Sequence, residues 1–192
     1  MMEILYYAER NEPYKHISNM IQIALNLIDV KFEGKFDKGG NDYKDHLLHV
    51  SSEVANYANN ECKNKYTPMG IFFNKAFIVA LLHDIIEDTE LTIDDLIKEG
   101  IDDTEILDAI KTLTKDPNER YFDYIKKVKE NDIAKFVKRF DLLHNMDLTR
   151  LTDLNEKDLK RINKYWWSWK FLIGETTEEL AYSKIYNKNA NS

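Results

Sequence analysis

One short stretch of the chain concentrates side chains that can bind a cation or move a proton. It reads His83-Asp84-Ile85-Ile86-Glu87-Asp88 and follows directly on an apolar run. On a helix, residues four apart share a face, so His83 would lie beside Glu87 and Asp84 beside Asp88. Carboxylates at the C-terminal end of a helix oppose its dipole, and burying them is costly unless they are paired or bind a cation. The stretch therefore indicates a metal site, with an exposed polar helix end as the alternative.

Two further stretches could complete such a site. Asp141 lies among apolar residues and shares a helical face with Asn145, although it could instead pair with a base such as Lys138. Upstream, His46 and His49 are both candidate ligands, and their spacing alone does not choose between them. A lone histidine is more often a hydrogen-bonded core or surface residue than a metal ligand. These residues therefore indicate a metal site only when they are taken together.

The combined set predicts metal-assisted hydrolysis. Two imidazoles and two carboxylates suit a divalent ion such as Mn, Fe, Co or Zn. Such an ion lowers the pKa of a bound water and polarises a phosphoryl oxygen. Two carboxylates, Glu87 and Asp88, would remain to orient or deprotonate the water. Hydrolysis of a phosphate ester needs these groups.

Helices must position these residues, because apolar residues recur at helical spacing along the chain and no alternating strand pattern stands out. The run AFIVALL is apolar on all sides, as expected of a helix buried in the core. Thr92 and Asp95 predict the capped start of a short helix that Gly100 ends. The predicted helices cover about 14–30, 43–60, 70–88, 93–98, 104–112, 119–130, 132–147 and, in the tail, about 156–169.

Composition agrees with one all-α domain. The chain has 192 residues, 43% of them apolar and 32% charged, with 6 glycines and 3 prolines. The net charge of −7 argues against broad binding to nucleic acid. No apolar run approaches the roughly 18 residues of a membrane span, and no signal peptide stands out. A single cysteine excludes a disulfide framework, so we expect a cytoplasmic protein with no membrane partner.

The ordered set of histidines and aspartates resembles the HD-domain metal-dependent phosphohydrolases. Within that superfamily the chain looks like the hydrolase domain of RelA/SpoT-type alarmone enzymes and the stand-alone small alarmone hydrolases. Four segments carry the resemblance, namely GKFDKGGNDYKDHLLHV, ALLHDIIEDT, LTIDDLIKEGIDDTEILDAIKTLTK and VKRFDLLHNM. They cover about residues 20–150, and the tyrosine that two residues separate from the first metal histidine selects His46 over His49.

The resemblance implies an HD-domain helical bundle with a metal site between helices. It implies a single domain over 1–192, with a core at 14–150 and a C-terminal helical extension at 151–192. The implied reaction removes pyrophosphate from the 3′ position of guanosine tetra- or pentaphosphate and leaves GDP or GTP. The implied roles are Mn(II) binding by His46, His83, Asp84 and Asp141, water activation by Glu87 and Asp88, and nucleotide binding by Lys38 and Asn145.

Several positions depart from the family pattern. Asp37 stands where a basic residue is common, Leu47 where proline follows the metal histidine, and Asp147-Leu148 where Arg-Thr follows His-Asn-Met. Added carboxylates disfavour a polyanion, so Asp37 and Asp147 favour an alternative HD phosphohydrolase acting on another nucleotide. A non-catalytic nucleotide-binding module is a third hypothesis, disfavoured because no ligand or carboxylate is missing. The chain leaves no room for a synthetase domain, so no pyrophosphate transfer to GTP is expected.

The C-terminal tail is rich in aromatic residues: Tyr165, Trp166, Trp167 and Trp169. We expect them to pack on the helical body. As an exposed patch they would instead form the surface of a homodimer. The sequence thus predicts a small-molecule nucleotide as the binding partner. If the aromatic tail is exposed, it also predicts a homodimer that forms through the tail.

Overall fold

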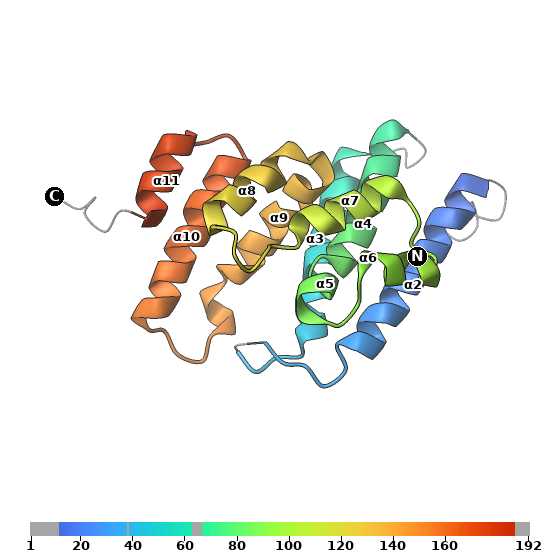
Figure 1. Ribbon diagram of the computed structural model, residues 1–192, viewed down its shortest axis with the longest axis horizontal. Coiled ribbons are helices and arrows are strands. Elements are labelled where there is room, and N and C mark those ends of the chain that lie inside the picture. Colours follow the sequence, from blue (N-terminus) through green and yellow to red (C-terminus); the bar gives the residue numbers. More distant parts are fainter. Residues whose placement is uncertain (1–11, 38, 63–66, 187–192) are drawn as a thin grey trace.

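The computed structural model describes residues 12–37, 39–62 and 67–186, and within these ranges the chain is all-helical, as predicted (Figure 1). An isolated antiparallel bridge joins Phe36 to Asp42 in the loop before the second described helix. The helices are α2 Glu12–Lys31, α3 Tyr43–Glu61, α4 Pro68–Leu82, α5 Ile85–Asp88, α6 Ile93–Glu99, α7 Thr104–Leu113, α8 Tyr121–Glu130, α9 Asp132–Asn145, the 3₁₀ turn η1 Leu148–Arg150, α10 Glu156–Leu172 and α11 Glu178–Tyr186.

Helix α4 forms the centre of the core. Its buried residues include Ala76 and the run from Ile78 to Leu82. Helices α2, α3, α7 and α9 all pack against it (Figure 1). Its N-terminus is capped by Thr67, whose hydroxyl accepts from Gly70 N, and Pro68 follows where no backbone N–H is needed. The predicted core helix, apolar on all sides, is confirmed.

The predicted unbroken helix after the apolar run is wrong at one point, because α4 ends at Leu82 and α5 begins at Ile85. Asp84 has φ −104° and ψ 1°, which departs from helical geometry. Asp88 N still donates to Asp84 O at 2.9 Å, so the chain re-enters a helix after a bend. Adjacent residues of a regular helix point about 100° apart. The bend instead brings His83 Nε2 within 3.3 Å of Asp84 Oδ2.

Contrary to the expectation that no apolar run approaches the length of a membrane span, the stretch Pro68–Asp88 is long and apolar enough to cross a membrane by length and composition. Its most apolar 18-residue window has a mean hydropathy of 1.6, and 56% of that window is buried inside the protein. The core helix of a helical bundle has the same composition. Here α4 makes up most of the stretch, and its apolar side chains pack against four neighbouring helices.

The predicted helix boundaries around α6 are confirmed. Thr92 Oγ1 accepts from Asp95 N, and the Asp95 carboxylate accepts from Thr92 N, which together form a capping box. Gly100 ends the helix with φ 101°, a left-handed backbone that glycine adopts without steric cost. Asp103 then caps the start of α7 with its carboxylate.

The C-terminal extension packs on the body of the protein through α10, which contacts α8, α9 and α11. The tail helix from residue 156 is confirmed, whereas α11 was not predicted. Tyr165 and Trp169 pack against the core, as expected. Trp166 is 43% exposed and stacks on Trp169 with ring centroids 5.7 Å apart. The aromatic tail is therefore partly core and partly surface.

Candidate metal centre

The four predicted metal ligands come from three helices and meet between them. His46 lies in the first turn of α3, His83 and Asp84 form the bend after α4, and Asp141 lies in α9. Their side chains are between 1% and 15% exposed. Ligand atoms of His46, His83 and Asp84 lie within 4.8 Å of one another. Asp141 Oδ1 lies 3.2 Å from His46 Nε2.

The separations between these donor atoms suit one shared ion. The two Nε2 atoms of His46 and His83 are 3.2 Å apart. Asp84 Oδ2 lies 3.6 Å and 3.3 Å from them, and Asp141 Oδ1 lies 3.2 Å and 3.6 Å from them. Two donors each about 2.1 Å from one ion lie about 3.0 Å apart at a right angle and about 3.4 Å apart at a tetrahedral angle.

The hydrogen bonds behind the histidines set which ring nitrogen carries the proton. His83 Nδ1 lies 2.7 Å from Ala80 O, which can only accept, so in the neutral ring Nε2 presents a lone pair. Arg150 Nη1 donates to His144 Nδ1 at 3.1 Å, and His46 Nδ1 lies 2.6 Å from the same atom. Because His144 Nδ1 accepts, His46 Nδ1 donates. The two Nε2 atoms, 3.2 Å apart, then need a positive charge between them, either a proton on one ring or a metal ion.

The charges around the histidines also favour a cation. Burial lowers the pKa of His83, but Asp84 and Asp141 outweigh this effect and raise it to about 10. Burial alone would raise the pKa of Asp84, but the charge of His83 and the hydrogen bond with His46 keep it below its ordinary value. These residues therefore stabilise positive charge at the centre, as a proton on the imidazole or as a metal ion.

Asp141 realises both alternatives that the sequence left open. Its Oδ2 lies 2.6 Å from Lys138 Nζ, while Oδ1 faces His46. Asn145 Nδ2 donates to Oδ1 at 2.6 Å, so the predicted nucleotide residue contacts a predicted ligand. Burial raises the pKa of Asp141, but Lys138 outweighs it and holds the pKa well below its usual range. The carboxylate thus stays ionised in a buried position.

The two predicted water-activating residues are held in different ways. Asp88 Oδ2 lies 2.7 Å from the Tyr43 hydroxyl, which is also 2.7 Å from Asp84 Oδ2. Burial and the charge of Asp84 raise the pKa of Tyr43, so its hydroxyl stays protonated. Glu87 Oε1 accepts from Lys115 N at 3.0 Å, in the loop after α7. Burial raises the pKa of Glu87.

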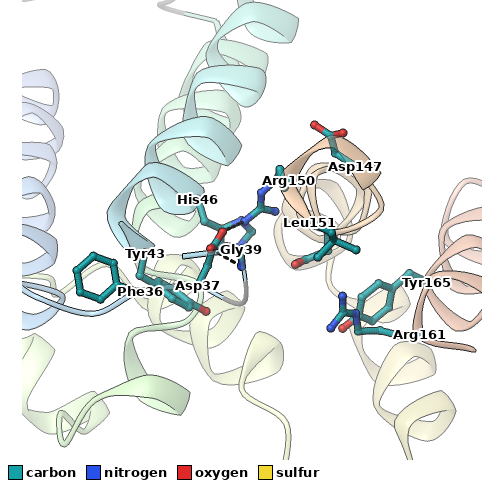
Figure 2. Close-up of a pocket in the computed structure, with 11 residues that line it drawn as sticks. Phe36, Asp37, Gly39, Tyr43, His46, Asp147, Arg150, Leu151, Arg161 and Tyr165 are labelled. Carbon is teal, nitrogen blue, oxygen red and sulfur yellow. Dashed lines mark hydrogen bonds and ion pairs between the residues drawn. The ribbon is translucent and has the colours of Figure 1, made fainter. Parts of the chain in front are cut away.

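A cleft of about 210 Å³ opens beside His46. Figure 2 shows Phe36 on one side of this cleft and Arg161, from α10, on the other. Asn145, which is predicted to bind the nucleotide, lines the cleft. Lys38, the other predicted nucleotide residue, lies outside the described residues. The cleft therefore adjoins the candidate metal centre and is walled by two segments far apart in the sequence.

The two acidic residues that are predicted to disfavour a polyanionic substrate, Asp37 and Asp147, both lie at this cleft. Asp37 Oδ2 accepts from Arg150 Nη2 at 2.6 Å, which offsets its charge (Figure 2). Asp147 Oδ1 accepts from Thr149 N at 2.9 Å and caps η1. The Asp37 carboxylate therefore repels an anionic ligand less than its charge alone suggests.

The cleft is also lined by Tyr43, Arg150, Arg161 and Tyr165, none of which was predicted to be a site residue. Tyr43 had a local signal, because it precedes His46 by three residues and so shares its helical face. Arg150 had none, because its partner Asp37 lies 113 residues away in the chain.

No protein-family model matches the chain, and no curated protein matches it.

Proposed function

We propose that this chain is a metal-dependent phosphohydrolase of the HD type that acts on a nucleotide. One observation supports it most: two imidazole nitrogens and two carboxylates converge at separations suited to one divalent ion. The donor set suits Mn(II), with Fe, Co or Zn as alternatives. When bound, such an ion would polarise a phosphoryl oxygen and acidify a water.

In this proposal the protein's side chains divide the work. His46, His83, Asp84 and Asp141 hold the ion. Asp88 and Glu87 orient the attacking water and take its proton. The raised pKa of Glu87 brings that carboxyl closer to neutral pH, where a general base works best. Asn145 holds the nucleotide in the cleft beside the centre.

The substrate we propose is guanosine tetra- or pentaphosphate, with pyrophosphate leaving from the 3′ position. The support is the order of motifs, in which the histidine-aspartate pair is followed by Glu87 and Asp88 and later by Asp141 and Asn145. A second candidate is another nucleotide, such as a nucleoside 5′-phosphate. It is favoured by Asp147 at the cleft, because a carboxylate there disfavours a ligand with many phosphates.

Pyrophosphate release from guanosine tetraphosphate tests the proposal. We expect release of pyrophosphate and GDP with Mn(II) present and none with a chelator. No release from the tetraphosphate, with hydrolysis of another nucleotide in the same panel, would move the proposal to the second candidate. Metal binding with no hydrolysis of any nucleotide would favour the non-catalytic binding module.

The paired substitution Glu87→Gln with Asp88→Asn tests the assignment of the water-activating residues. We expect turnover to fall by about 100-fold or more, because a positioned base contributes at least that much. Mn(II) affinity, measured by calorimetry, should change by less than about threefold, because neither residue holds the ion. Glu90→Gln is the matched control, since Glu90 pairs with Lys31 on the surface. Unchanged turnover in the paired variant would refute the assignment.

A further inference from the structure

Tyr43 links a ligand of the candidate metal centre to a carboxylate outside it. Its hydroxyl lies 2.7 Å from Asp84 Oδ2 and 2.7 Å from Asp88 Oδ2. The Asp84 oxygen is the one that faces the Nε2 atoms of His83 and His46, at 3.3 Å and 3.6 Å. One hydroxyl therefore joins a ligand oxygen to the proposed base.

The Tyr43 ring is fixed from two sides. It stacks on buried Phe32 with ring centroids 5.2 Å apart and an interplanar angle of 13°. It also lies edge-on to His46, with centroids 5.8 Å apart. Tyr43 is the first residue of α3, and the preceding Asp42 caps that helix by accepting from Lys44 N. The hydroxyl is thus placed by packed rings and a capped helix start.

The backbone of Asp88 is held by the same aromatic cluster. Lys35 Nζ donates to Asp88 O, and this ammonium lies 5.1 Å from the centre of the Phe32 ring. Tyr43 Oη contacts the Asp88 carboxylate. Lys35 therefore holds the backbone of Asp88 and Tyr43 holds its carboxylate, and both of these residues lie against the Phe32 ring.

A phenol hydroxyl carries one proton, so Tyr43 can donate to only one of the two carboxylates at a time. In the proposed reaction a water O–H bond breaks and its proton goes to Asp88, while the water oxygen bonds to phosphorus. The bond between phosphorus and the 3′ oxygen breaks, and that oxygen leaves as a hydroxyl after taking a proton from solvent. Once Asp88 holds that proton, it can donate to Tyr43 Oη while Tyr43 donates to Asp84. All three groups then have a hydrogen-bond partner, so the bridge stabilises the state in which Asp88 is protonated.

We propose that Tyr43 is a positioning residue that orients the Asp88 carboxylate against the metal ligand Asp84 and accepts a hydrogen bond from Asp88 after proton transfer. The base-positioning part rests on the proposed function. The part concerning Asp84 rests on the metal centre alone, since the hydroxyl contacts the ligand oxygen directly.

A double-mutant cycle tests the base-positioning part. Tyr43→Phe keeps the ring stacked on Phe32 and removes only the hydroxyl. We expect kcat to fall by about 10- to 100-fold, the usual loss for an outer partner of a metal site, with KM within about threefold. In an Asp88→Asn background the same substitution should cost less than about threefold, because Tyr43 acts through Asp88. An equal loss in both backgrounds would overturn this part.

Metal affinity tests the other part without any turnover. We expect the Mn(II) dissociation constant of Tyr43→Phe, measured by calorimetry, to rise by about tenfold, because Asp84 loses its hydrogen-bond donor. A change below about twofold would overturn it. Tyr57→Phe is the matched control, because Tyr57 lies on the same helix and its ring packs against Phe73 and Phe136 instead.

The two parts separate failure of the bridge from failure of the proposed function. A wild-type protein that binds Mn(II) but hydrolyses no nucleotide would remove the proposed function and the base-positioning part together. The affinity of Tyr43→Phe would then still decide whether Tyr43 holds the ligand. Circular dichroism of Tyr43→Phe checks that the helices are intact, so that a loss of Mn(II) affinity can be attributed to the metal centre and not to unfolding.

Discussion

Lys138 carries a charge inside the protein, and its side chain is only 13% exposed. Its ammonium lies 2.6 Å from Asp141 Oδ2 and 5.4 Å from the centre of the Tyr124 ring. Burial lowers the pKa of Lys138, but Asp141 outweighs it and holds the pKa well above its ordinary value. The lysine thus neutralises a ligand carboxylate from behind, while the other oxygen of that carboxylate faces the centre.

Removing this ammonium should destabilise the protein most when no metal is bound. We expect Lys138→Met to lower the free energy of unfolding by about 3 kcal/mol in chelator, because Asp141 becomes an uncompensated buried charge. A bound divalent ion would offset part of that loss. Urea unfolding with chelator and with Mn(II) measures both values. Lys135→Met on the same helix, at a surface pair with Asp132, should cost less than about 1 kcal/mol. Equal losses in the two variants would contradict this account.

Helix α6 shows how one element is bounded by its end residues. Gly100 has φ 101°, and a Cβ there would meet Ile23 Cδ1 at 2.9 Å. Gly174, after α10, has φ 81° and no neighbour within 4 Å of such a Cβ. The two glycines share the left-handed backbone but differ in the space beside it.

Alanine at these two glycines should therefore have unequal effects. We expect Gly174→Ala to lower the free energy of unfolding by about 1 kcal/mol, the cost of a left-handed alanine. Gly100→Ala should cost about 2 kcal/mol, because Ile23 must also move out of its packed position. Thermal unfolding of the two variants measures the difference. A loss at Gly174 that equals or exceeds the loss at Gly100 would show that the contact with Ile23 contributes nothing.

The capping box of the same helix sets a pH dependence. Hydrogen bonds from Thr92 and Lys98 lower the pKa of Asp95 to about 2. A lowered pKa means that the carboxylate stabilises the fold above its ordinary pKa of 3.8, and that this contribution is lost as pH falls through about 2. In Thr92→Ala we expect the pKa of Asp95 to rise toward its ordinary value, measured by NMR titration. An unchanged pKa would assign the shift to Lys98 instead.

At the scale of the whole molecule, the candidate centre joins segments that are far apart in the chain. His46 and Asp141 come from α3 and α9, and the bend at His83 and Asp84 lies between them in sequence. In an unfolded chain these donors are dispersed, so an ion that they share binds the folded state preferentially. Metal binding should therefore stabilise the entire fold.

This coupling predicts a shift in thermal stability. At a free Mn(II) concentration 100 times its dissociation constant, the stabilisation is about 2.7 kcal/mol. For a chain of this size that corresponds to a rise in Tm of about 5–10 °C. Scanning fluorimetry with Mn(II) and with chelator measures the shift. Asp84→Asn should abolish it, whereas the surface variant Glu90→Gln should retain it. A shift that survives in Asp84→Asn would place the ion elsewhere.

Local chemistry made several features predictable from the sequence. Helical class followed from the spacing of apolar residues, and the ends of α6 followed from Thr92 and Gly100, because caps act within one turn of the chain. The candidate ligands His83, Asp84 and Asp141 were found by residue type, since few side chains bind metal. Helix α11 was missed, because its sequence lacks a strong apolar stripe.

What only the tertiary structure decided depends on contacts between distant segments. The spacing of His46 and His49 could not choose a ligand, whereas packing of α3 against α4 puts His46 Nε2 3.2 Å from His83 Nε2. The bend that turns His83 and Asp84 to one centre had no residue signal, because neither glycine nor proline marks it. The Tyr43 bridge likewise spans 41 and 45 residues. Sequence periodicity reports which face of an element is apolar, but the distance between two polar atoms on different elements is set only when those faces pack.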